Sequence, residues 1–313
     1  MKLSVLRKLM ANVPPDFDYK DQTQRSKYVQ QMGLDPGAIY QELEMESDYV
    51  DTHRDVSFAG SPVNLHSHDF YELLYCCNTC GAEYLVGTER YRLQKGDVIL
   101  IPPGLSHRPL LPDSMAEPYI RIVLWISREF MANILRSFPE VLMSKTSYSV
   151  LLRTAGTPWE SLEELFLKGA KIAQESSDES RLLLIGNTIT LLAHLRQAFL
   201  DRAAGRIKAE KPELLDRIMT YIEQNLSRHI TLTDTAKAFY VSESTVSHIF
   251  RNKLGVSFYR FVTQRRLIAA KVLIQEGSIL EQVAEQVGFS DYSSFYRAFK
   301  QEYGISPRQF RKL

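Results

Sequence analysis

Histidines and a glutamate stand at spacings that one site could use. His66, His68, Phe70 and Glu72 alternate along the sequence, so on a β-strand their side chains share one face. His107 follows a Pro-Pro-Gly turn farther along the chain. Three imidazoles and a carboxylate that converge inside a barrel could hold a divalent transition metal. They could instead hydrogen-bond an organic ligand without a metal, with Phe70 against a sugar ring, or form a purely structural polar cluster.

A second group of polar side chains lies in an internal repeat near the C-terminus, where residues 235–242 resemble residues 283–290. Each copy predicts a short helix, a tight turn and a second helix that begins at a serine cap, Ser242 or Ser290. This is the helix-turn-helix arrangement, whose second helix can lie in the major groove of DNA. Two copies could present two such helices about one DNA turn, ~34 Å, apart.

The elements that must position these residues follow from the hydrophobic pattern. Residues 49–126 alternate polar and apolar side chains between frequent turn residues, which is typical of a small barrel or sandwich. Helical spacing follows in 159–174 and 182–200, where two apolar stripes predict two packing partners, the barrel and a second subunit. We therefore expect a multidomain α+β chain with four parts: an unassigned N-terminal arm (1–45), a sensor barrel (46–126), a helical dimerisation and linker region (127–210) and an all-α DNA-binding domain (211–313).

Composition narrows the class of protein. The 313 residues are 44% hydrophobic and 24% charged, as in an ordinary soluble globular chain of two domains. Residues 211–313 carry 15 basic and 10 acidic residues, a net charge of +5 in a chain whose total is +1, which favours an anionic partner for that part. We expect a cytoplasmic protein without a membrane span or disulfide framework, with Cys76, Cys77 and Cys80 as small apolar residues at a strand end.

The pattern across both copies of the repeat resembles the DNA-binding domain of AraC/XylS-type transcriptional regulators. The resemblance rests on residues 264–273, 279–291 and 295–300, and on Gly304-Ile305-Ser306-Pro307. It implies which residues face DNA: Ser244, Ser247 and His248 with flanking Glu243, Thr245 and Arg251 in the first copy, and Tyr292, Ser293, Tyr296 and Arg297, followed by Lys300, in the second. We expect Arg297 to contact a guanine, and Arg251 and Lys300 to contact phosphates. At position 248 the family often has arginine, so His248 is a departure.

The spacing of the histidines is similar to both motifs of the cupin barrel, a double-stranded β-helix. In that resemblance His66, His68, Glu72 and His107 match the metal ligands. Two positions depart from the motifs: the glycine expected after Glu72 arrives late, at Gly81, and Leu111 stands where asparagine is expected. Cupin-like sensor domains of AraC-type regulators imply a small effector, often a sugar.

The two resemblances together predict a sequence-specific transcriptional regulator that is controlled by a small effector. The family resemblance implies an activator, because regulators of this family more often activate transcription. Its expected partners are promoter DNA, the effector, RNA polymerase and a second copy of the chain, with no membrane. No catalytic residue is predicted. The alternative is a metal-dependent cupin enzyme, a dioxygenase or isomerase, with an accessory DNA-binding domain.

Overall fold

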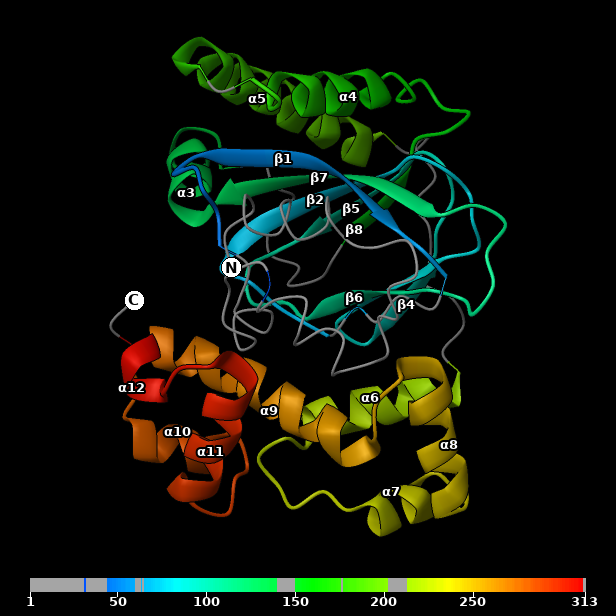
Figure 1. Ribbon diagram of the computed structural model, residues 1–313, viewed down its shortest axis with the longest axis vertical. Helices are drawn as coiled ribbons and strands as arrows, with labels where there is room; N and C mark the ends of the chain where they lie inside the picture. The colour runs from blue at the N-terminus through cyan, green and yellow to red at the C-terminus, as the bar shows by residue number, and fades with distance from the viewer. Residues whose placement is uncertain are drawn as a thin grey trace.

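The computed structural model describes residues 31, 44–59, 63, 65–139, 150–175, 177–201 and 213–311. The predicted N-terminal arm lies outside the described residues, apart from residues 31, 44 and 45. Figure 1 shows a β-rich part with helices over one side and an all-helical part on the opposite side. The expected multidomain α+β fold is therefore confirmed.

Two antiparallel sheets form the β-rich part within the described residues. One has the strand order β1-β7-β2-β5-β8 and the other β4-β3-β6. The strands are β1 (Val50–Ser57), β2 (Phe70–Cys76), β3 (Glu83–Val86), β4 (Glu89–Arg92), β5 (Asp97–Ile101), β6 (His107–Leu110), β7 (Tyr119–Ser127) and β8 (Val150–Arg153). Strand β8 pairs with β5, so the sheet continues beyond residue 126 into the region expected to be a helical linker.

Strand β2 is covered on both faces, because successive side chains of a strand point in opposite directions. Phe70 and Leu74 pack in the apolar core between the two sheets. Leu73 and Tyr75 pack in a second core, under the helices. Glu72 lies on the face of Phe70 and Leu74, so its carboxylate points into the barrel.

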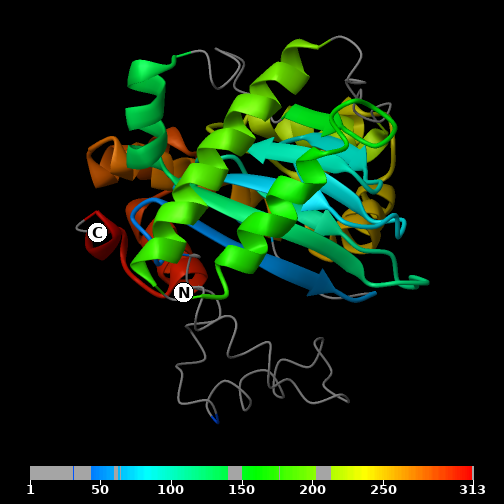
Figure 2. The ribbon, with the colours of Figure 1, turned by 90° about the horizontal axis from the view of Figure 1, so that it is seen from above.

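Helices cover the outer face of the larger sheet. They are α3 (Arg128–Ser137), α4 (Leu162–Ile172) and α5 (Asp178–Leu200), of which the last two confirm the predicted helical spacing. Figure 2 shows α4 and α5 lying across the sheet. In α5, Leu191 and Leu195 are buried in the core under the helices, whereas Leu182 and Leu183 are mostly exposed. By length and composition α5 could also cross a membrane, although 44% of the relevant window is buried inside the protein.

The C-terminal part consists of helices. They are α6 (Leu214–Gln224), α7 (Leu232–Ala238), α8 (Glu243–Leu254), α9 (Phe258–Gln275), α10 (Leu280–Gln286), α11 (Tyr292–Tyr303) and α12 (Pro307–Phe310). The pairs α7–α8 and α10–α11 are the two copies of the repeat, joined by α9 (Figure 1). Phe250 and Phe299 occupy matching core positions and are fully buried, which stabilises each unit by roughly 1.5–3 kcal/mol per side chain.

The two copies differ at the start of their second helices. Ser242 caps α8, as predicted, and accepts a hydrogen bond from the Thr245 amide. The prediction for the second copy is wrong by one residue. Asp291 rather than Ser290 caps α11, and the Ser290 hydroxyl donates to the Asp291 carboxylate. A carboxylate at this end is also favoured by the helix dipole.

The tight turns need a positive φ at equivalent positions, which are Tyr240 (55°) and Gly288 (89°). A Cβ at Gly288 would lie 2.1 Å from the Leu226 carbonyl oxygen, so only glycine fits the second turn. The side chain of Tyr240 is 96% exposed and meets no such obstacle.

Candidate functional site

The structure brings together three of the predicted site residues in the barrel. His68 lies just before β2, Glu72 lies within β2 and His107 begins β6. Their ligand atoms all lie within 4.8 Å of one another, and all three side chains are buried. We call His68, Glu72 and His107 the sensor cluster. His66 forms a β-bridge with His107, and their rings lie 4.4 Å apart, so His66 flanks the cluster.

Phe70 belongs to the wall of this site. Its ring stacks on the His68 imidazole, with the centroids 3.8 Å apart and the planes nearly parallel. On the other side its ring lies 4.8 Å from that of Trp125. The Phe70 ring therefore packs between the His68 imidazole and the Trp125 indole, and helps to hold His68 in place.

Backbone carbonyls orient both imidazoles of the sensor cluster. The Nδ1 of His68 lies 2.9 Å from the Phe70 carbonyl oxygen, and the Nδ1 of His107 lies 2.8 Å from that of Leu105. A carbonyl oxygen can only accept, so each Nδ1 carries the proton and each Nε2 is turned toward Glu72. This is the arrangement that fixes the ring orientation of metal-bound histidines in proteins.

The carboxylate of Glu72 lies where the two Nε2 atoms meet. Its Oε2 is 2.6 Å from Nε2 of His68 and 3.6 Å from Nε2 of His107. Trp125, which pairs with Glu72 across β2 and β7, donates from Nε1 to the same oxygen at 3.3 Å. Nothing in the sequence pointed to Trp125, because that pairing depends on the register between strands far apart in the chain.

The sensor cluster has the donor set of a cation site. Burial alone would raise the pKa of Glu72, but the imidazoles of His107 and His68 hold it well below its usual range. Among the described residues, no hydrogen-bond partner reaches Nε2 of His107, although this atom is fully buried. Two imidazole nitrogens and a carboxylate suit a divalent transition metal, so these residues fit the group that the cupin resemblance implies.

The predicted DNA-facing residues lie mainly on the outside of α8 and α11. Within each helix the alternate face carries the core residues Val246 and Phe250, or Phe295 and Phe299. The exposed side chains are Glu243, Ser244, His248 and Arg251 on α8 and Ser293, Arg297 and Lys300 on α11, while Thr245, Ser247, Tyr292 and Tyr296 are half-buried. Figure 1 places α8 and α11 near opposite ends of α9.

Several of these side chains are held by neighbours on the same unit. Asn252 contacts Nε2 of His248 at 2.9 Å, and Thr233 donates to Glu243 at 2.7 Å. Arg297 donates to the Ser294 hydroxyl at 3.4 Å. Glu243 therefore links α7 to α8, whereas His248 and Arg297 contact only nearby residues of their own helices in these hydrogen bonds.

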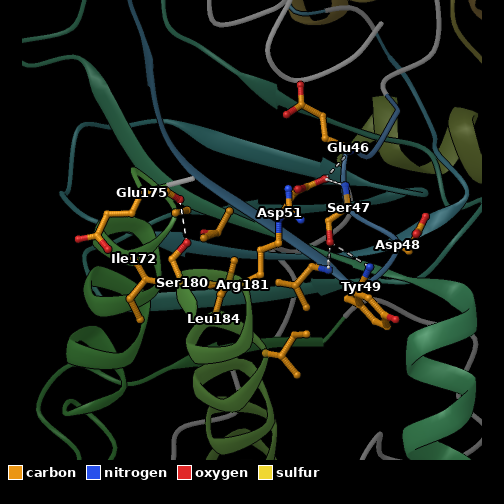
Figure 3. Close-up of a pocket in the computed structure, with 14 residues that line it drawn as sticks. Glu46, Ser47, Asp48, Tyr49, Asp51, Ile172, Glu175, Ser180, Arg181 and Leu184 are labelled. Atoms are coloured by element: carbon orange, nitrogen blue, oxygen red, sulfur yellow. Dashed lines mark hydrogen bonds between the residues drawn. The ribbon is translucent and has the colours of Figure 1, made fainter. Parts of the chain in front are cut away.

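A separate hollow lies between the start of β1 and the helices α4 and α5 (Figure 3). Asp51 in its wall accepts hydrogen bonds from the backbone amides of Glu46 and Ser47, and burial raises its pKa. Ser180 donates to the Glu175 carbonyl. These polar groups form hydrogen bonds with nearby backbone. They therefore converge on a ligand position less than the side chains of the sensor cluster do.

Comparison with known proteins finds matches for both parts of the chain. Residues 53–185 match the AraC-like ligand-binding domain, and residues 235–313 match a helix-turn-helix domain. The uncharacterized HTH-type transcriptional regulator YfiF of Bacillus subtilis is 29% identical over 255 residues, 80% of this chain and 79% of that protein. The arabinose operon regulatory protein of Salmonella typhimurium is 28% identical over 229 residues, 71% of this chain and 77% of that protein.

A solved structure is also similar to part of this chain. The C-terminal domain of AraT, a response regulator from Geobacillus stearothermophilus, has 32% sequence identity and a TM-score of 0.30. The match covers 31% of this chain and 81% of that one.

Proposed function

Since this chain belongs to the AraC family of transcriptional regulators, we propose that it activates a promoter when a small effector occupies the sensor cluster of its ligand-binding domain. The observation that carries the proposal is the pairing of two units in one chain. Buried His68, Glu72 and His107 converge in the barrel, and α8 and α11 expose polar side chains at the other end.

The two recognition helices divide the reading of DNA. Arg297 suits a bidentate contact to guanine, because its guanidinium is exposed and offers paired donors. Arg251 and Lys300, also exposed, suit phosphates. The shorter contacts to bases or sugars fall to Ser244, Ser247, His248, Tyr292, Ser293 and Tyr296, with Glu243 and Thr245 at the start of α8.

Two chemistries of effector suit the sensor cluster. A divalent transition metal would be held by His68, Glu72 and His107, with His66 beside it. An organic effector would use the same nitrogen and oxygen atoms as hydrogen-bond partners. One relative is named an arabinose operon regulatory protein and another a lactose operon transcription activator, which favours a sugar-related promoter.

A second copy of the chain and RNA polymerase complete the proposed complex. Leu182, Leu183 and Ile189 of α5 are each about half exposed or more, and apolar side chains on one helix favour contact with another protein surface. We propose that this face of α5 joins two copies, and that the dimer acts in the cytoplasm, where it meets promoter DNA and RNA polymerase.

Binding to the DNA upstream of its own gene tests the function. The purified chain should shift this DNA in a gel, lose affinity steeply as salt rises and respond to an effector. Failure to discriminate this DNA from a scrambled duplex, with sugars or divalent metals added in turn, would overturn the proposal. Product formation that depends on a bound metal would instead support the cupin enzyme, a dioxygenase or isomerase with an accessory DNA-binding domain.

A further inference from the structure

The strand that carries His107 also contacts the first recognition helix. Neighbouring residues of a strand point to opposite faces, so Arg108 points out of the barrel where His107 points in. Nη1 of Arg108 donates to the carbonyl oxygen of Leu254 at 2.7 Å. Leu254 is the last residue of α8. A cation on a terminal carbonyl stabilises a helix end, because those carbonyls lack partners within the helix.

Apolar packing and ion pairs strengthen this contact. Leu65 and Leu85 of the barrel belong to the same buried core as Phe250 of α8. Beside them Arg90 pairs with Glu213 at 2.9 Å, just before α6. The barrel and the first helix-turn-helix unit therefore share one continuous core.

The second unit is built differently. Its apolar core is formed, in the described part of the chain, by residues from Leu267 to Phe310, without a barrel residue. The barrel does touch the connecting helix α9, where Nζ of Lys271 lies 3.3 Å from the Ser67 carbonyl oxygen. The same Nζ lies 5.1 Å from the ring centroid of Tyr303, the last residue of α11. The barrel thus shares a core with the unit of α8 and meets the unit of α11 by way of α9.

We propose that the sensor barrel controls the first recognition helix, α8, by direct contact, and that it reaches the second, α11, only through α9. This inference rests on the proposed function and adds which half of the DNA site is regulated directly. Arg108 is the positioning residue: it is covalently next to His107 of the sensor cluster and bonded to the end of α8. A ligand that changes the position of His107 acts on α8 through this residue, and a ligand shifts an equilibrium only through such differential contacts.

A set of double-mutant cycles tests the asymmetry. Arg108→Ala is combined with His248→Ala on α8 and, separately, with Arg297→Ala on α11, and the dissociation constant for the upstream DNA is measured each time. If two residues are coupled, the dissociation constant of the double variant departs by about threefold or more from the value expected from the two single variants. If they are independent, the two single effects on the free energy of binding add. We expect coupling between positions 108 and 248 and none between 108 and 297. Glu72→Gln, which alters the sensor cluster itself, should couple more strongly to position 248 than to position 297.

Controls separate this contact from general damage. Arg92→Ala removes a mostly exposed arginine of β4, in the same sheet as β6, and should couple to neither helix. Arg108→Lys keeps the charge and should restore part of the coupling if Arg108→Ala folds poorly. In hydrogen exchange without DNA, Arg108→Ala should speed exchange in the last turn of α8 and leave α11 unchanged.

The results separate the two claims. Equal coupling of position 108 to both helices, or coupling to neither, in protein that binds the upstream DNA normally would overturn the asymmetry and leave the proposed function standing. Equal acceleration of exchange in α8 and α11 would overturn it as well. Wild-type protein that ignores the upstream DNA would overturn the proposed function, and this inference with it.

Discussion

Arg297 and Lys300 lie one turn apart on α11, and replacing each with alanine should affect DNA binding in different ways. Both side chains are exposed, and the hydrogen bond from Arg297 to Ser294 is long, at 3.4 Å. Exposed substitutions of this kind change the free energy of unfolding by less than about 0.5 kcal/mol. A change in DNA affinity therefore reports the contact with DNA and not damage to the fold.

The expected magnitudes follow from the type of contact. Loss of a bidentate contact between Arg297 and guanine costs about 1–3 kcal/mol on the cognate site and much less on scrambled DNA. This corresponds to a rise in the dissociation constant of roughly 5- to 150-fold. Loss of a phosphate contact at Lys300 weakens both duplexes alike and makes the slope of log K against log salt shallower by about 0.9.

Fluorescence anisotropy can separate these outcomes. Each variant is titrated against labelled cognate and scrambled duplexes between roughly 50 and 200 mM salt, the range over which phosphate contacts dominate. If Arg297→Ala weakened both duplexes equally and changed the salt slope by about 0.9, Arg297 would be a phosphate contact. If it changed neither affinity nor slope, α11 would not lie in the groove at all.

Three further predictions concern the rest of the chain. Glu72→Gln removes the anionic member of the sensor cluster and should weaken Co²⁺ binding by more than about tenfold, read from the visible absorption of the bound ion; unchanged binding would contradict metal coordination there. Burial would raise the pKa of Asp55, but Arg121 at 2.8 Å lowers it to about 2, so this pair stabilises the fold above the unfolded pKa of 3.8. Asp55→Asn should therefore lower the thermal midpoint at neutral pH by the equivalent of about 1–2 kcal/mol, and the difference should shrink as pH falls from 4 toward 2; a difference independent of pH would refute the ion pair. Exchanging Leu182 and Leu183 for glutamate should convert the proposed dimer to a monomer in light scattering, and a dimer that persists would assign the interface elsewhere.

The helix-turn-helix units were predictable because their structure is local. Apolar spacing, a cap and a tight turn fall within about twenty residues in each unit, so sequence alone places α7–α8 and α10–α11. The error at the second cap, Asp291 in place of Ser290, has a physical cause: both residue types accept the hydrogen bond that a helix start needs. Spacing fixes the helix start only to within one or two residues.

The sensor cluster was predictable in part. Alternation along one strand put His68 and Glu72 on the same face, and the structure confirms that both point into the barrel. The contribution of Trp125 depends on the pairing of β2 with β7, and β8 was missed because four residues carry little pattern. Such pairings are decided by packing across the whole sheet, which no short window of sequence contains.

The contact between barrel and first recognition helix shows where local reasoning stops. The alternation of side chains along a strand predicts that His107 and Arg108 face opposite ways. It does not predict what covers the outer face, because that depends on how the surfaces of the barrel and of the helix-turn-helix unit fit together. Arg108 supplies the physical signature of the fit: burial lowers its pKa to about 10, a cost that an arginine bears only with a partner, here the Leu254 carbonyl. One peptide bond therefore joins a residue of the sensor cluster to one that holds the end of α8. A movement of β6 along its own axis cannot shift His107 without also displacing the hydrogen bond to α8.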